Sequence, residues 1–240
     1  MPDTPLDRAL RDLVDGSAAG DSDDRELPVA GTALVVRDGD AGIQVLLIQR
    51  PDTGSFASAW VFPGGKLEAS DRDGLPEDAT EEDVARRAAV RETLEEAGLV
   101  IRPAATLSVW DPPAGAKPRI RTWFFLAADP AGDLALAEGE VVGAEWVRPR
   151  DLLDRHASGE ATLYPPTWVT LTAIADTPDF ATLVAGIRFE RFTTSARRGA
   201  SGPMLLWPDD AEYDGDAAGS ARHRLEVGSL PWVYTRTGEA

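Results

Sequence analysis

The sequence predicts an α/β fold built on a mixed β-sheet. Short runs rich in Val, Ile, Leu and aromatic residues recur between residues 32 and 147, as strands require. The helical segments between them are few, and one of them, residues 81–97, has clear start and stop signals. Strands with few, well-placed helices are typical of α/β or α+β domains with a mixed sheet.

The elements before residue 81 follow from local patterns of apolar, polar and turn-forming residues. We expect a helix over 6–14, an acidic flexible linker over 16–24, strands over 32–37 and 43–49 joined by a turn at 38–40, and a brief strand over 60–62. Pro63-Gly64-Gly65 ends this last strand, and residues 66–80 are polar and irregular.

The helix over residues 81–97 is predicted from its two ends. Thr80 is a suitable N-cap, and acidic residues fill the first turn. Gly98 stands where a helix usually ends in a left-handed conformation. After it we expect strands over 107–110, 120–127 and 144–147, helices beginning at 151 and 165, and strand-like runs over 187–194 and 204–207.

The length of 240 residues suits one domain with extensions. We divide the chain into an acidic N-terminal extension (1–27), a central domain (28–178) and a C-terminal extension (179–240) packed on the same domain. Cysteine is absent, which excludes disulfides, thiol catalysis and Cys-based metal sites. The basic residues are nearly all arginine, with Lys66 and Lys117 as the only lysines, which we interpret as genome composition.

Charge and hydropathy limit the classes of partner that the protein can bind. The net charge of −17 argues against general nucleic-acid binding, which needs a basic surface. No segment has the length and apolarity of a membrane helix, and the N-terminus lacks the apolar region of a secretory signal. We therefore expect a cytoplasmic protein without a membrane partner, although local cations can still bind a small anionic substrate.

Three carboxylates crowd the end of the predicted helix. Glu92, Glu95 and Glu96 fall within an arc of about 100°, where like charges repel and oppose the helix dipole. They continue a small apolar face made by Val84, Ala85, Ala88 and Ala89, whereas Arg86, Arg87 and Thr93 occupy the opposite side. A solvated acidic helix end is the simpler explanation, but a hard divalent cation such as Mg²⁺ would turn this repulsion into a binding site.

Two neighbouring features suit such a site. Gly64-Gly65 follows a strand and lets the backbone approach a ligand or metal, although most Gly-Gly pairs are plain turns. Arg91 lies at the edge of the glutamate face, where it forms either a surface ion pair or a bidentate contact that holds a loop or a carboxylate.

These residues together resemble the Nudix box, GX5EX7REUXEEXGU, in which U is aliphatic. The segments PGGKLE (63–68) and RETLEEAGL (91–99) carry the resemblance, and the second matches every fixed position. Thr93 departs from it at an aliphatic position. Gly65 stands 26 residues before Arg91 instead of 14, which is an insertion of 12 residues.

The insertion leaves two aspartates competing for the first acidic position of the box. Counting forward from Gly65 reaches Asp71, and counting back from Arg91 reaches Asp83, which is better placed to pair with Arg91 because it lies on the same helix. The insertion and the phrase VFPGGKLEASD (61–71) resemble a Nudix subgroup that includes the peroxisomal coenzyme A diphosphatase.

The resemblance implies a fold and an activity. It implies a Nudix-like α/β/α sandwich over residues 28–178 and metal-dependent hydrolysis of a pyrophosphate bond. The substrate would be a small anionic nucleotide, a nucleoside diphosphate linked to a coenzyme A-like or sugar-like moiety. The cofactor would be Mg²⁺ or Mn²⁺, and a homodimer is compatible with it. The alternatives are a catalytically weak nucleotide sensor or interaction module, and an acidic scaffold.

The resemblance also implies roles for individual residues. Glu92, Glu95, Glu96 and the Gly65 carbonyl would bind the metal, and Arg91 would orient the loop of the box. The base would be Glu95 or Glu140, which stands six residues before Trp146. Glu138 and Glu145 are alternatives to Glu140, and Arg50, Arg119 and Arg121 are candidates for contacting the substrate.

Overall fold

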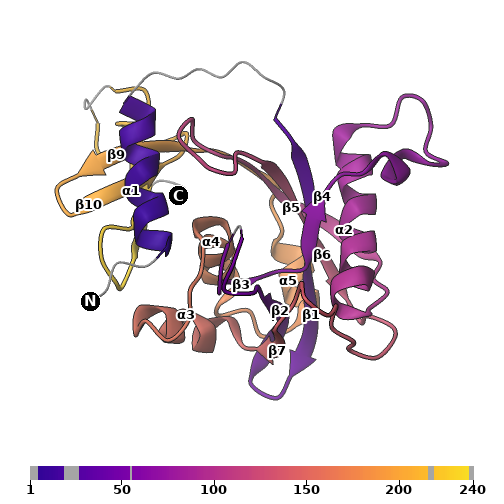
Figure 1. Cartoon of the computed structure of the whole chain (residues 1–240). Coiled ribbons are helices and arrows are strands. Elements are labelled where there is room, and N and C mark those ends of the chain that lie inside the picture. The colour runs from indigo at the N-terminus through magenta and orange to yellow at the C-terminus, as the bar shows by residue number, and fades with distance from the viewer. Residues whose placement is uncertain (1–4, 19–26, 55, 216–218, 238–240) are drawn as a thin grey trace.

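An eight-stranded mixed sheet forms the centre of the protein (Figure 1). The computed structural model describes residues 5–18, 27–54, 56–215 and 219–237. The main path of the sheet runs β3-β2-β1-β6-β5-β8, with β4 paired to β1 and β7 paired to β2. Its strands are β1 (Val29–Gly39), β2 (Gly42–Gln49), β3 (Trp60–Val61), β4 (Gly64–Lys66), β5 (Pro103–Asp111), β6 (Arg121–Ala128), β7 (Gly143–Val147) and β8 (Glu190–Thr193).

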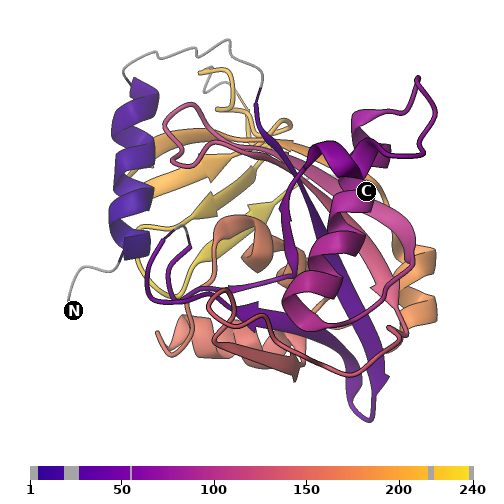
Figure 2. The same ribbon diagram turned by 45° about the vertical axis from the view of Figure 1, so that its right-hand side comes forward.

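Helices cover both faces of this sheet. The inner strands are buried on both sides: along β1, Leu34 and Val36 join one hydrophobic cluster, and Ala33 and Val35 join the other. Helix α2 (Glu81–Ala97) covers the second cluster (Figure 2), while α3 (Pro149–Ala157), α4 (Pro165–Ile174) and α5 (Phe180–Gly186) contribute to the first. The predicted α/β sandwich with a mixed sheet is confirmed. The predicted strands over 107–110 and 144–147 lie within β5 and β7, and the one over 120–127 overlaps β6, which begins and ends one residue later.

The ends of helix α2 lie where its caps predict. Thr80 accepts a hydrogen bond from the Asp83 amide at 3.2 Å, and Asp83 accepts one from the Thr80 amide at 2.9 Å. This reciprocal arrangement is a capping box, and it satisfies amides at the start of the helix. Gly98 ends the helix with φ of 73°, a left-handed conformation that suits glycine.

The buried arc of α2 is rotated relative to the prediction. It is centred on Ala85, Ala89 and Glu96, so Thr93 falls inside it. The placement of Thr93 on the outer side is therefore wrong: its side chain is fully buried and its hydroxyl donates to the Ala89 carbonyl at 2.7 Å. Glu95 lies at the rim of the arc, and 54% of its side chain is exposed.

A second, four-stranded sheet stands beside the central one and carries the N-terminal helix α1 (Pro5–Ala18). Its strands are β9 (Ser195–Gly199), β10 (Gly202–Leu206), β11 (His223–Glu226) and β12 (Val233–Arg236). Leu6, Leu10 and Val14 recur every four residues along α1 and are buried in the main cluster. Of the linker predicted over residues 16–24, residues 16–18 belong to α1 and the remainder lies outside the described residues.

The C-terminal elements were only partly predicted. The runs over 187–194 and 204–207 correspond to β8 and β10, whereas α5, β9, β11 and β12 were not anticipated. The four missed elements are four to seven residues long, so they hold too few turns or alternations to show a period. Within the described ranges, no helix combines the length and apolarity needed to cross a membrane.

The contact between α2 and β1 depends on the absence of a side chain at Gly31. A Cβ atom there would stand 1.9 Å from the Ala85 carbonyl oxygen and 2.9 Å from the Ala89 amide nitrogen. Both are backbone atoms and cannot rotate away. The helix can therefore lie this close to the sheet only because Gly31 has no side chain where it meets the backbone at Ala85 and Ala89.

We predict that Gly31→Ala lowers the free energy of unfolding by about 3 kcal/mol, because overpacking against rigid backbone forces the helix outward. Gly186→Ala is the matched control, since nothing lies within 4 Å of its added Cβ, and it should change stability by less than about 0.5 kcal/mol. Urea denaturation measures both. Equal midpoints for the two variants would contradict this account of the packing.

Candidate active site

Strand β4 brings its two glycines against the carboxylates of α2. Gly65 pairs with Gly31 and Gly64 with Thr32 in the antiparallel β1–β4 ladder. The Gly64 amide donates to Glu96 Oε2 at 2.9 Å. A Cβ at Gly65 would stand 2.1 Å from Glu92 Oε1, so a larger residue here would displace the Glu92 carboxylate from its position beside β4.

Glu96 is buried and paired with Arg50, the residue that follows β2. The carboxylate Oε1 lies 2.5 Å from Arg50 Nη1, and Arg50 Nη2 donates to the Gly64 carbonyl at 3.1 Å. Burial raises the pKa of Glu96 to about 7, and the Arg50 charge and the Gly64 amide offset part of the rise. Burial also raises the pKa of Glu92, against the opposing hydrogen bond from Arg91.

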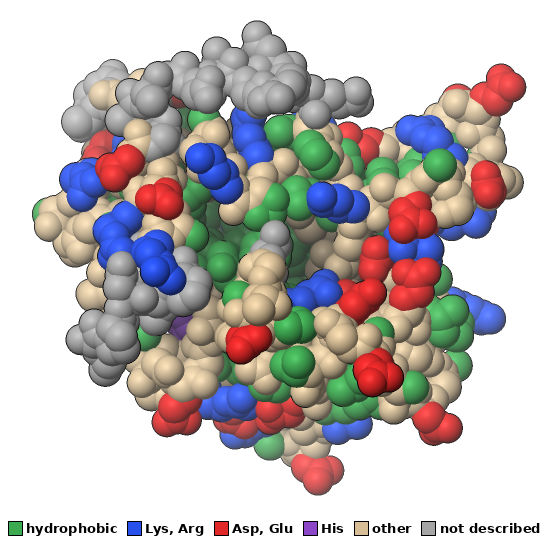
Figure 3. Space-filling view, in the orientation of Figure 1, with side chains coloured by type: hydrophobic (Ala, Val, Ile, Leu, Met, Phe, Trp, Pro, Cys, Tyr) green, Lys and Arg blue, Asp and Glu red, His purple; other side chains and the backbone are tan. Residues whose placement is uncertain are grey.

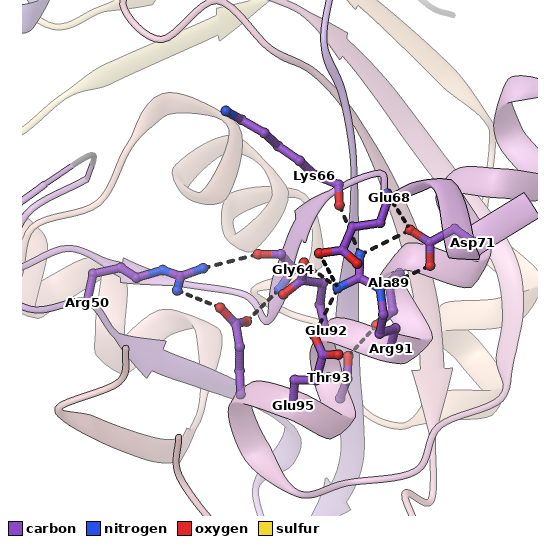
Figure 4. Close-up of polar contacts among 11 residues, drawn as sticks. Arg50, Gly64, Lys66, Glu68, Asp71, Ala89, Arg91, Glu92, Thr93 and Glu95 are labelled. Atoms are coloured by element: carbon purple, nitrogen blue, oxygen red, sulfur yellow. Dashed lines mark hydrogen bonds and ion pairs between the residues drawn. The ribbon is translucent and has the colours of Figure 1, made fainter. Parts of the chain in front are cut away.

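Arg91 is the hub of the site (Figure 4). Its Nε and Nη2 donate to the two oxygens of Asp71, each at 3.0 Å, and Nη2 also donates to the Lys66 carbonyl at 3.0 Å. Its Nη1 donates to Glu92 Oε1 at 2.9 Å and to Glu95 Oε2 at 2.8 Å. One guanidinium therefore joins β4, the segment after it that carries Asp71, and α2 through charge-assisted hydrogen bonds.

Asp71, and not Asp83, pairs with Arg91. The prediction that Asp83 pairs with Arg91 is wrong, because two turns of helix separate the two residues. The Asp83 carboxylate instead accepts a hydrogen bond from the Thr80 amide. Asp71 lies in a short 3₁₀ helix, η1 (Ala69–Arg72), and is 4% exposed. Burial raises the pKa of Asp71, but Arg91 and the Glu68 amide outweigh burial and leave this pKa below its usual value.

The donor set at this site suits a divalent cation. Glu92, Glu95, Glu96 and the Gly65 carbonyl supply only oxygen atoms, the ligands that Mg²⁺ and Mn²⁺ prefer. The carboxylates are held by Arg50 and Arg91, and among the described residues no three acidic or histidine side chains already meet in a metal-binding arrangement. The fit to the cation rests on these oxygen donors and not on their present arrangement.

A cavity of about 920 Å³ adjoins the carboxylates. Arg50, Gly64, Gly65 and Glu140 all line it. Of the three glutamates considered as a base beside Glu95, Glu140 lines this cavity, whereas Glu138 is absent from its wall and Glu145, in β7, pairs with Arg155 at 2.8 Å.

The three arginines considered for substrate contacts have different positions. Arg50 lines the cavity, whereas Arg121 is engaged by Asp111 and Glu81, and Arg119 does not reach the wall. Lys66 and Lys117 also line the cavity, and sequence reasoning assigned them no role. Their rarity was the available signal, since no other lysine occurs in the chain.

Comparison with known families decides what the fold and the box represent. The profile of the NUDIX domain matches residues 27–166, which is more than half of the chain. The chain belongs to the Nudix family. The predicted Nudix-type pyrophosphohydrolase, a hydrolase acting on phosphoanhydride bonds, is thereby confirmed.

A solved Nudix structure has the same fold. A NUDIX hydrolase from Alicyclobacillus acidocaldarius has 24% identity and a TM-score of 0.60, and the match covers 68% of this chain and 97% of that one. A MutT NUDIX hydrolase from Burkholderia pseudomallei has 26% identity over 62% of this chain and 98% of its own, with a TM-score of 0.47. No curated protein is significantly similar in sequence.

The Asp71–Arg91 pair gives a direct test of the Nudix box assignment. We expect Asp71→Asn to lower the free energy of unfolding by about 2 kcal/mol or more, because it leaves a partly buried arginine without its bidentate partner. Asp83→Asn keeps a side chain that can cap the helix, and should cost less than about 1 kcal/mol. Urea denaturation of both variants measures the difference, and a larger loss at Asp83 would refute the assignment.

Proposed function

We propose that this Nudix pyrophosphohydrolase uses a divalent cation to hydrolyse a pyrophosphate bond in a nucleoside diphosphate linked to a second moiety, coenzyme A-like or sugar-like. The observation that carries the proposal is the pair of arginines that hold three glutamates at the edge of the cavity: Arg91 holds Glu92 and Glu95, and Arg50 holds Glu96. A pyrophosphate placed there would face carboxylates, a backbone carbonyl and the Arg50 guanidinium.

Three carboxylates and one backbone carbonyl would supply the metal ligands. Glu92, Glu95, Glu96 and the Gly65 carbonyl would hold Mg²⁺ or Mn²⁺. When bound, the cation neutralises charge on the phosphate oxygens. Arg91 positions Glu92 and Glu95 relative to β4, and Arg50 does the same for Glu96.

The base that deprotonates the attacking water must reach solvent. Glu96 is 1% exposed and paired with Arg50, which argues against it. Glu95 has half of its side chain exposed, and Glu140 lines the cavity. Glu95 and Glu140 are therefore the two candidates for the base.

A catalytically weak nucleotide sensor is the second candidate function. The observation in its favour is that Arg50 and Arg91 already occupy the carboxylates that a cation needs. Thr93, the departure from the aliphatic position, gives it no support, because the buried hydroxyl is satisfied by Ala89 and the helix continues to Ala97.

The same proposal covers the Nudix subgroup, the location, the partners and the oligomeric state. The similarity to the coenzyme A diphosphatase subgroup stays a proposal, which rests on the 12 additional residues and the phrase VFPGGKLEASD in the sequence. A cytoplasmic location and the absence of nucleic-acid and membrane partners are supported by the charge of −17 and by the lack of cysteine. A homodimer stays a prediction.

The activity is tested with coenzyme A, ADP-ribose, NADH and dinucleoside polyphosphates in the presence of Mg²⁺ or Mn²⁺. We expect Glu96→Gln and Glu95→Gln to lower kcat at least about 100-fold on the substrate that is turned over, as loss of a metal ligand or base requires. Full activity in both variants would refute the assignment, and nucleotide binding without turnover in the wild type would favour the sensor.

The base is distinguished by a second pair of variants. Glu140→Gln should lower kcat about 100-fold if Glu140 is the base. Glu138→Gln lies two residues away, outside the cavity wall, and should leave kcat unchanged. If Glu140→Gln also leaves kcat unchanged, Glu95 is the remaining candidate.

A further inference from the structure

We propose that the second moiety of the substrate carries an apolar group, and that this group binds in the cavity between the Nudix core and the two terminal extensions. The inference rests on the proposed function and names the class of substrate. It assigns to α1 and to the C-terminal sheet the role of a specificity wall.

The cavity has an apolar floor next to the carboxylate site. Three buried aromatic residues line it: Trp110 of β5, Phe124 of β6, and Phe62 between β3 and β4. Trp110 turns its one polar atom elsewhere, because Nε1 donates to Ser108 Oγ at 3.1 Å. Figure 3 shows the hollow near the centre of the view, floored by hydrophobic side chains.

Such a floor favours hydrocarbon over sugar. A ribose or hexose loses hydrogen bonds to water when it is buried and needs protein partners in return. The three aromatic side chains offer none, whereas a buried alkyl or acyl chain gains free energy with every methylene removed from water.

The opposite wall comes from outside the matched Nudix domain. Ala9 and Leu13 of α1 and Leu205 of β10 line the cavity, and all three lie beyond residues 27–166. Leu6 and Leu10 of α1 are buried in the main hydrophobic cluster and hold the helix in place. A Nudix core without these extensions would leave this side of the cavity open to water.

Cations stand around the cavity. Lys66 of β4, Lys117 of the β5–β6 loop and Arg8 of α1 are exposed and line it, and none has a carboxylate partner within the part of the chain that the structure describes. The Lys66 side chain points away from the carboxylate cluster (Figure 4). In a chain of net charge −17, unpaired cations above an apolar floor suit an amphiphile with an anionic head and an apolar chain.

The probes are two esters of ADP, one with a methyl and one with an octyl group on the β-phosphate. Hydrolysis breaks the P–O–P bond, water adds to one phosphorus, and the products are AMP and the alkyl phosphate. Binding to the full chain is measured by titration calorimetry in EDTA, and turnover is measured with Mg²⁺ or Mn²⁺. We expect the octyl ester to bind at least tenfold more tightly, because each fully buried methylene contributes about fourfold.

The second part of the experiment fills the cavity with a larger side chain. Ala9→Phe places a ring in the cavity and should reduce the octyl-to-methyl ratio of binding constants at least fivefold. Ala185→Phe is the matched control, an exposed alanine of α5 outside the cavity wall, and should leave the ratio unchanged. Circular dichroism checks that both variants fold, and the wild-type ratio decides the question if Ala9→Phe does not.

The outcomes separate this inference from the proposed function. Equal binding of the two esters to the wild type overturns the inference even where both are hydrolysed. An unchanged ratio in a folded Ala9→Phe variant also overturns it, because the nucleoside would then occupy the cavity. Preferential binding of the octyl ester without any turnover supports the inference and refutes the proposed pyrophosphohydrolysis.

Discussion

The close contact of helix α2 with strands β1 and β4 is the constraint on which the site depends. Gly31 removes the side chain that would strike the Ala85 carbonyl, and Gly65 removes the one that would strike Glu92. The small residues Ala85 and Ala89 complete the approach. Because backbone meets backbone here, the carboxylates at the end of α2 lie beside the glycine pair instead of in open solvent.

That contact forces acidic groups into a partly dry environment, which is costly unless the charges are paired. Two arginines supply the pairing. Arg50 reaches Glu96 from the end of β2, and Arg91 joins Asp71, Glu92 and Glu95. The same guanidinium groups donate to carbonyl oxygens of β4, so the electrostatic compensation also holds this strand beside the carboxylates.

The extensions change what the Nudix core presents to a ligand. Strand β8 adds to the central sheet at β5, and α1 packs on β9 and β10. Together they place apolar side chains opposite the aromatic floor, with the only two lysines of the chain at the same cavity. The candidate active site and the proposed specificity wall thus come from different parts of the chain and meet only in the folded molecule.

Local interactions are what the sequence by itself determined. The capping box at Thr80, the left-handed Gly98 and the glutamate spacing depend on residues within a few positions of each other, so the bounds of α2 and its acidic end were predictable. Only the tertiary structure decided which aspartate meets Arg91, how far α2 is rotated and where Thr93 points. These depend on contacts between residues 20 or more apart, such as Arg91 with Asp71 or Gly31 with Ala85, and no local period encodes them.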